Sequence, residues 1–265
     1  MIAYRDNGIV FVAKDGSYRA DRSLSGIWIL SLETSERRRI FAGGNLPSWS
    51  PDGSQLVFYA GQILKMNVDG SGLSQLTLRG RNGYPSWSPD GSKIAYDSDF
   101  ESEVGHVVWV MHSDGTQARN ISTMATEEWR MPSWRPDGQQ IVHIRYADEV
   151  GFRPEIYTMN TSGDDSRRIT HRRGRESTPR FSPDGGRIAF SADGQVWLMS
   201  ASGHSPRQVT TRGGVDPSWS PDGTKLLYTR MATSENGPSD GVLWIINLAT
   251  LEETQITFKW PEIVP

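Results

Sequence analysis

The sequence predicts an all-β fold, a six-bladed β-propeller with four antiparallel strands in each blade. Three observations predict it. The heptapeptide Pro-Ser-Trp-Ser-Pro-Asp-Gly, or a close variant, occurs five times in the 265 residues. Its copies begin between 38 and 47 residues apart, close to the period of about 40–45 residues that is typical of propeller blades. Each copy is followed by short apolar segments of strand length rather than by a helical pattern.

The heptapeptide itself predicts the innermost strand of a blade and the turn that follows it. Ser-Pro-Asp-Gly suits a type I turn, because Pro fixes φ at the second position and Gly suits the fourth. The aromatic residue before the turn is large enough to fill the wedge between blades. We therefore interpret the motif as structural. Its copies begin at Pro47, Pro85, Pro132, Pro179 and Pro217.

Three further segments follow each motif and predict the second, third and fourth strands. In the second copy of the motif they are an apolar segment at 94–96, another at 107–111, and a short one at 120–122 that ends in Ser. Four antiparallel strands in each unit are the pattern of a propeller blade. We expect a single domain over 1–265 with blades at about 1–44, 45–81, 82–126, 127–174, 175–213 and 214–258, and a closing strand at 260–265.

The first unit lacks the heptapeptide and is interpreted as a degenerate blade. Residues 8–13 predict its second strand, 27–32 its third and 38–41 its fourth. Its innermost strand comes either from residues 2–4 or from the C-terminal segment, and we favour the C-terminal one. Closure by either segment would remove exposed sheet edges.

The composition excludes several classes of function. The formal net charge of −3 gives no overall attraction to nucleic acid, and the absence of cysteine excludes thiol catalysis and disulfides. No apolar segment is long enough to span a bilayer, and residues 1–6 are not a signal peptide. The acids at 97–101 lack the Gly and terminal Glu of a calcium loop, and the five histidines fall in different repeats. We expect no cofactor, no metal and no catalytic residue.

The tandem motif, with third strands of the type Trp-Val-Met at 109–111 and an Asn-Val-Asp-Gly turn at 67–70, resembles the TolB-like propeller family. The resemblance implies a six-bladed ring and binding of partner proteins of the cell envelope at the mouth of its channel. It also implies a periplasmic location if this chain is a mature or excised fragment; the sequence alone indicates no compartment. TolB proteins carry an additional N-terminal α/β domain, which we do not expect in this chain. Similar repeats occur in propellers that gate prolyl-oligopeptidase-type peptidases, but no Gly-x-Ser-x-Gly motif occurs here.

The alternation of strands predicts which loops share a face. The connections from fourth to first strand lie on the same face as those from second to third strand, and the Pro-Asp-Gly turns lie on the opposite face. Long second-to-third connections are expected at 14–26, 97–105, 147–154 and 231–241. Because variable loops on a rigid scaffold often carry binding residues, we expect the working site at this mouth.

The segments before each motif supply the candidate partner-binding residues. They combine acids, bases, amides and aromatic rings, which suits a peptide or protein better than a purely anionic ligand. Trp129 and Arg130 are the leading candidates because these residue types are enriched at binding hot spots; Trp129 could equally pack over the blade edge. The candidates are Asn45, Asn82, Tyr84, Glu128, Trp129, Arg130, Glu176 and Asp216.

Two arginines replace motif serines and complete the candidate set. Arg135 stands before Pro136 and Arg180 after Pro179. A cation on an inner strand needs water or an acid, so we expect one or both to reach the channel and to pair with Glu176 or Asp216. The alternative is an ordinary structural ion pair.

The function favoured by these observations is non-catalytic binding of a protein or peptide by a monomeric propeller. An enzyme acting on a sugar or a peptide, as a lyase or hydrolase with its site in the same mouth, is the alternative. A third interpretation is the propeller domain of a larger protein.

Overall fold

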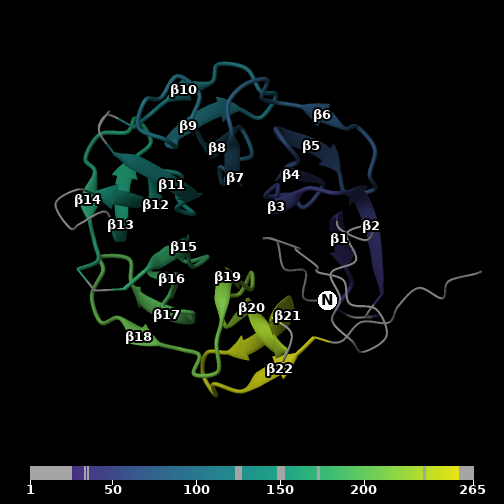
Figure 1. The fold of residues 1–265 in the computed structure, drawn as a ribbon, viewed down its shortest axis with the longest axis vertical. Coiled ribbons are helices and arrows are strands. Elements are labelled where there is room, and N and C mark those ends of the chain that lie inside the picture. The colour runs from purple at the N-terminus through teal and green to yellow at the C-terminus, as the bar shows by residue number, and fades with distance from the viewer. Residues whose placement is uncertain are drawn as a thin grey trace, which may run out of the picture.

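The blades lie side by side around a central channel (Figure 1). The computed structural model describes residues 26–32, 34, 36–122, 127–147, 153–171, 174–234 and 237–256. They form five four-stranded antiparallel sheets and one two-stranded sheet, which confirms the predicted all-β propeller with four strands per blade. None of the described residues forms a helix long and apolar enough to cross a membrane.

The four-stranded sheets are called blades 1 to 5 in chain order, and each runs from the channel outwards. Blade 1 contains β3 (Asn45–Trp49), β4 (Gln55–Tyr59), β5 (Ile63–Asn67) and β6 (Ser74–Gln75). Blade 2 contains β7 (Asn82–Trp87), β8 (Lys93–Ser98), β9 (Val107–His112) and β10 (Arg119–Asn120). Blade 3 contains β11 (Glu128–Trp134), β12 (Gln140–Ala147), β13 (Arg153–Asn160) and β14 (Arg167–Arg168). Blade 4 contains β15 (Glu176–Phe181), β16 (Arg187–Ala192), β17 (Gln195–Ser200) and β18 (Arg207–Gln208). Blade 5 contains β19 (Val215–Trp219), β20 (Lys225–Ser234), β21 (Gly237–Asn247) and β22 (Glu253–Gln255).

The two-stranded sheet pairs β1 (Gly26–Leu30) with β2 (Arg37–Ala42). These strands match the expected third and fourth strands of the first unit. The sheet packs on both of its neighbours, since Trp28 contacts the core of blade 5 and Ile27 that of blade 1. The other strands expected for this unit, at 2–4, 8–13 and 260–265, lie outside the described residues.

The aromatic residue of each motif fills the wedge between two blades, as predicted. Trp134 packs on Ala95 and Val108 of blade 2, and Trp219 packs on Ala189 and Val196 of blade 4. The indole Nε1 of Trp134 also donates a hydrogen bond of 3.2 Å to the carbonyl of Ser86 in the preceding blade. Trp219 does the same to Arg180 at 3.1 Å. These side chains therefore set the spacing of the blades.

The Pro-Asp-Gly turn is held by a small hydrogen-bond network. In blade 2, Ser88 Oγ donates to Asp90 Oδ1 at 2.6 Å and accepts from the backbone N–H of Lys93 at 2.9 Å. The Ser92 N–H also donates to Asp90. These hydrogen bonds favour the ionised carboxylate and lower the pKa of Asp90 to about 2. The motif serine and aspartate thus fix the turn.

Long cations tie the outer parts of neighbouring blades together. Lys65 Nζ donates to the carbonyl of Ser113 in the next blade at 2.7 Å, and Arg119 Nη2 donates to that of Thr161 at 3.2 Å. Each of these contacts reaches the turn after the third strand of the following blade. The ring is therefore held at its rim as well as at its inner wedges.

The innermost strands share an irregularity one residue before the motif proline. In all five blades the pairing of the first and second strands shifts register there, which marks a β-bulge. The residue at that position has a positive φ between 47° and 58°, which is uncommon for residues other than glycine. We call this set the mouth-side ring: Leu46, Tyr84, Met131, Thr178 and Asp216.

Blade 5 differs from the others at the mouth. The segment 231–241 was expected to be a long loop, but β20 and β21 continue through it and leave a short connection after Ser234. That expectation was wrong because the pairing of β20 with β21 extends to Ser234 and Gly237. The result is an extended hairpin on the face where the first strands begin.

Candidate functional site

The channel is narrow at the mouth-side ring. Tyr84, Thr178 and Asp216 come from blades 2, 4 and 5 and meet there with Leu46 and Arg180. They leave a cavity of about 20 Å³, room for about one water molecule. The bulges place these side chains, because an additional residue in a strand re-aims its neighbours.

The charged groups around this constriction interact electrostatically. Burial raises the pKa of Tyr84, and the carboxylates of Asp216 and Asp97 act in the same direction. The guanidinium groups of Arg130 and Arg180 oppose the shift. Blades 2, 3, 4 and 5 therefore each contribute a polar group within electrostatic reach of one phenol.

Asp216 carries the second shifted group of the constriction. Asp216 is exposed to the channel, yet the atoms of the surrounding wall partly desolvate its carboxyl group and raise its pKa. The charge of Arg180 and a hydrogen bond from Thr178 act in the opposite direction. Its backbone N–H donates to Ser191 Oγ at 2.9 Å, which anchors the bulge to the preceding blade.

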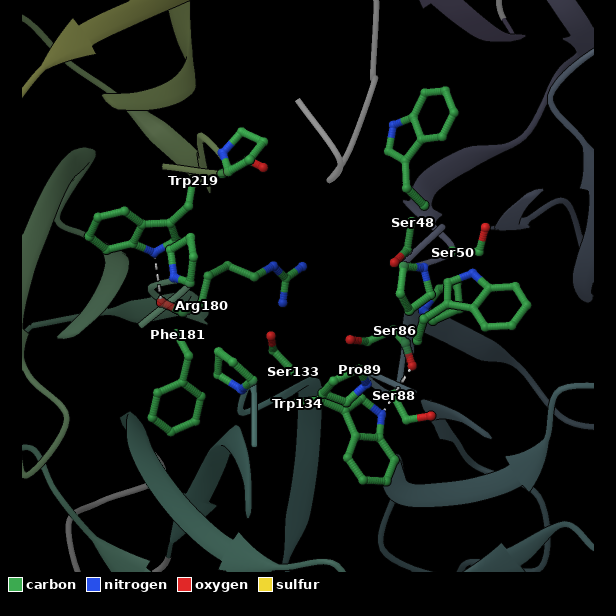
Figure 2. Close-up of a pocket in the computed structure, with 18 of the residues that line it drawn as sticks. Ser48, Ser50, Ser86, Ser88, Pro89, Ser133, Trp134, Arg180, Phe181 and Trp219 are labelled. Carbon is green, nitrogen blue, oxygen red and sulfur yellow. Dashed lines mark hydrogen bonds between the residues drawn. The ribbon is translucent and has the colours of Figure 1, made fainter. Parts of the chain in front are cut away.

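On the side of the Pro-Asp-Gly turns the channel opens into a cavity of about 330 Å³, which we call the turn-side chamber. Its wall is formed by motif residues of all five blades. Arg180 extends into the middle of this space, and the hydroxyl groups of Ser48 and Ser133 point towards the same region (Figure 2). Ser50 and Ser88 point away from it (Figure 2).

Comparison with known proteins identifies the family. The TolB beta propeller domain family matches residues 84–259, about two thirds of the chain. This chain belongs to that family.

Individual TolB-family relatives resemble the chain over most of its length. An uncharacterized protein of Agrobacterium fabrum is 27% identical over 220 residues, which cover 77% of this chain and 72% of the relative. The Tol-Pal system protein TolB of Francisella tularensis subsp. mediasiatica is 29% identical over 233 residues, or 79% of this chain. The chain spans about half of that protein, since the match covers 53% of its length.

Solved structures share the fold with this TolB-family chain. The crystal structure of TolB from Acinetobacter baumannii has a TM-score of 0.70 and 20% sequence identity, covering 85% of this chain and 58% of that one. An oligogalacturonate lyase in complex with manganese has a TM-score of 0.56 and 20% identity, covering 78% and 62%. At these identities the likeness concerns the fold.

The structure places six of the ten predicted site residues of this TolB-family propeller around the mouth of the channel. Tyr84, Arg180 and Asp216 line the constriction. Arg130 lies within electrostatic reach of Tyr84 and pairs with Glu128, whose Oε1 is 3.5 Å from Arg130 Nε. Asn45, at the start of β3, is exposed at the same end of the channel.

Trp129 does not lie at the mouth, and its prediction as an exposed contact was wrong. Its side chain is 0% exposed and stacks on His143, with ring centroids 4.6 Å apart. The guanidinium of Arg145 lies 5.4 Å from the same ring. Successive side chains of a strand point to opposite sides, so Trp129 packs between blades while Arg130 faces the opening.

Asn82 and Glu176 were also predicted to bind a partner, but both side chains are buried. The amide of Asn82 donates to Gln62 Oε1 at 2.9 Å and to two backbone carbonyls. The carboxylate of Glu176 accepts hydrogen bonds from Thr170 Oγ1 and from the N–H of Ile156. These residues fasten the segment that enters β7 or β15, and buried polar groups are normally satisfied in this way.

The two arginines that replace motif serines have different positions. Arg180 reaches the channel and interacts electrostatically with Asp216, as one alternative predicted. Arg135 lies on the turn side of blade 3, pairs with Asp137 at 3.4 Å and lies 5.8 Å from the ring of Phe181. The prediction that Arg135 pairs with Glu176 or Asp216 was therefore wrong, and its role is an ordinary structural ion pair.

Sequence reasoning missed Thr178 and the whole turn-side chamber. Thr178 occupies the same place before the motif proline as Tyr84 and Asp216, and that shared position was the available signal. The chamber was missed because the motif was interpreted as packing and turn chemistry alone.

Two of the three acids at 97–101, discounted as a calcium loop, are engaged within the protein. Asp97 Oδ1 lies 2.9 Å from His106 Nδ1, and Asp97 Oδ2 accepts from the Met131 N–H at 2.9 Å. Asp99 pairs with Arg81 at 2.6 Å. Within the part of the chain that the structure describes, no group of three or more His, Asp and Glu side chains is placed to hold a metal ion.

Proposed function

We propose that this TolB-family propeller is a non-catalytic scaffold that binds a protein or peptide at the mouth of its channel. The observation that supports it is that Tyr84 and Asp216, from two blades, line a constriction with room for about one water molecule, with Arg130 of a third blade within electrostatic reach of Tyr84. A site this narrow suits a partner that sits across the opening rather than one that passes through it.

The chemistry of the mouth supports a polypeptide partner. It offers both signs of charge, a phenol and an exposed amide, and Tyr and Arg are residue types that often dominate binding energy. The extended hairpin of β20 and β21 lies on the same face and would contact a partner bound at the mouth. The relative from Francisella is a Tol-Pal system protein, which is consistent with work in a protein assembly.

The test is capture of partners from a native lysate with the wild-type chain and a Tyr84→Ala/Arg130→Ala double variant. We expect the double variant to lose at least one specific partner that the wild type captures. Arg207→Ala, which changes an exposed cation on the outer strand β18, is the matched control and should retain every partner. Equal recovery by the wild type and the double variant would contradict the mouth as the binding site.

We further propose that the ring closes with six blades, of which the sheet of β1 and β2 supplies the third and fourth strands of the remaining one. The packing of that sheet between blades 1 and 5 supports this. Deletion of residues 260–265 should lower the melting temperature if the C-terminal segment is the closing strand. An unchanged melting temperature would favour residues 2–4 in that place.

A further inference from the structure

The turn-side chamber is a well-defined cavity separate from the mouth. Its volume of about 330 Å³ falls at the lower end of the range of small-molecule sites. The mouth-side ring, with its cavity of about 20 Å³, lies between the chamber and the mouth. A ligand of the chamber would therefore enter from the face of the Pro-Asp-Gly turns.

One position of the repeat gives the chamber its chemistry. Directly after the motif proline, four blades carry serine, namely Ser48, Ser86, Ser133 and Ser218, and blade 4 carries Arg180. Among the described residues that line the chamber, Arg180 is the one with a charge. Among the described residues, the chamber wall is therefore a ring of hydroxyl groups into whose middle the Arg180 cation extends (Figure 2).

The cation is suited to bind a carboxylate. A guanidinium carries five N–H donors in a planar fork that matches a carboxylate with two parallel hydrogen bonds. Arg180 donates to the carbonyl of Pro179 at 3.3 Å and interacts with Asp216 across the constriction, and five donors can serve these groups and a ligand together. The hydroxyl groups of Ser48 and Ser133 point into the same space (Figure 2) and could donate hydrogen bonds to the carboxylate oxygens from the side opposite Arg180.

The rest of the chamber wall favours a ligand whose remaining part, apart from the carboxylate, is apolar. Motif prolines and aromatic residues such as Pro89, Trp134 and Trp219 surround the hydroxyl ring. Such a wall gains from contact with apolar groups, and its described residues offer no charge besides Arg180.

We propose that the turn-side chamber is a second ligand site, which binds a small carboxylate with an apolar body through Arg180. Two sources carry this chemistry: a free organic acid, and the C-terminal carboxylate of a peptide with an apolar last residue. Both fit an opening on the turn face and an anchor in the middle of the channel.

The experiment measures binding of two matched pairs of probes by isothermal titration calorimetry. One pair is 3-phenylpropionate and 3-phenylpropionamide. The other is the peptide Gly-Gly-Pro-Phe with a free C-terminus and the same peptide as its amide. We expect the acids to bind at least about tenfold more tightly than the amides, because a charge-assisted hydrogen bond contributes about 1.5–3 kcal/mol, a factor of about 10–100.

Arg180→Ser is the decisive variant, since it gives blade 4 the residue that the other four blades carry at this position. It should lose about 10- to 100-fold in affinity for the acid and little for the amide. Arg135→Ser is the matched control, because it also restores a motif serine but lies outside the chamber wall. It should bind as the wild type does. Melting temperatures and near-ultraviolet circular dichroism check that both variants are folded.

The outcomes separate the two sources and can overturn the proposal. Preference for the phenylpropionate alone assigns a free organic acid, and preference for the free peptide alone assigns a chain end. Equal binding of acid and amide, unchanged binding by Arg180→Ser, or no binding of either acid at millimolar concentration would refute a carboxylate site. Loss of lysate partners in the mouth variants does not bear on this result, because Tyr84 and Arg130 lie outside the chamber wall.

Discussion

The two ends of the channel are built from the same five strands but by opposite rules. On the turn side the blades repeat nearly the same residues, and at the position after the motif proline Arg180 stands against four serines. At the mouth-side ring each blade carries a different residue, although the backbone is the same in all five. The turn side therefore repeats one set of residues around the channel, whereas the mouth-side ring presents a different side chain from each blade on the same backbone.

The ends also differ in what their acids contribute to stability. Hydrogen bonds from the turn lower the pKa of Asp52, Asp90 and Asp222 to about 2, so their ionisation favours the fold. Desolvation raises the pKa of Asp216 at the mouth, so its ionisation opposes the fold. Residues that hold a scaffold and residues that serve a site often differ in this way.

The largest effect is expected from the wedge between blades. Trp134→Ala should lower the free energy of unfolding by about 3–5 kcal/mol, because it empties a buried volume and removes the hydrogen bond to Ser86. Trp134→Phe copies the residue of blade 4 and should cost about 1 kcal/mol. Urea unfolding measures both. An equal cost for the two variants would show that the wedge does not depend on side-chain volume.

A middle-sized effect separates two serines of one motif, Ser86 in β7 and Ser88 directly after it. Ser88→Ala should cost about 1–3 kcal/mol, since it removes the hydroxyl that bridges Asp90 and the N–H of Lys93. Ser86→Ala alters a residue of the chamber wall and should change the free energy of unfolding by less than about 0.5 kcal/mol. The same urea titration measures both, and comparable losses would contradict the division between turn serines and channel serines.

The smallest effect is a pH dependence whose sign differs between the two ends. The turn aspartates have lowered pKa values, so the stability they give is complete above about pH 4 and is lost as the pH falls towards 2. Asp216 has a raised pKa, so it costs stability as the pH rises through its ionisation. The melting temperature of Asp216→Asn, relative to the wild type, should therefore increase between pH 3 and pH 7.

Thermal unfolding of both chains across that pH range checks this prediction. Asp222→Asn serves as the turn-side control and should show the opposite trend, falling relative to the wild type as the pH rises. Parallel curves for Asp216→Asn and the wild type would show that the carboxyl group is not desolvated.

Much of the fold could be predicted from the sequence because a motif with a well-defined local structure occurs five times. Pro and Gly in Ser-Pro-Asp-Gly fix a turn, and the spacing of its copies fixes the size of a blade. The strands that follow Pro85 were predicted correctly for that reason. Four strands per blade are confirmed, and the six-blade count stays a prediction.

The site was harder to predict because it depends on the direction of single side chains. Trp129 and Arg130 are neighbours in one strand, so only one of them could face the channel, and the sequence shows no register that decides which. The bulge before Pro132 shifts that register and has no sequence signature, since Leu46, Tyr84, Met131, Thr178 and Asp216 share no chemistry. Asn82 and Glu176 looked like exposed loop residues, and only the neighbouring strands show that they are enclosed.

The positive φ before each motif proline is kept in five blades although the residue type at that position of the mouth-side ring differs in each. Because five different residue types occupy this bulge, each blade has one position at which the side chain facing the mouth can differ while the motif stays the same. A propeller of this kind could acquire a new partner through single substitutions at a few of these positions while its fold stays the same. Ring-shaped relatives with the same motif can thus diverge in what they recognise while their architecture stays constant.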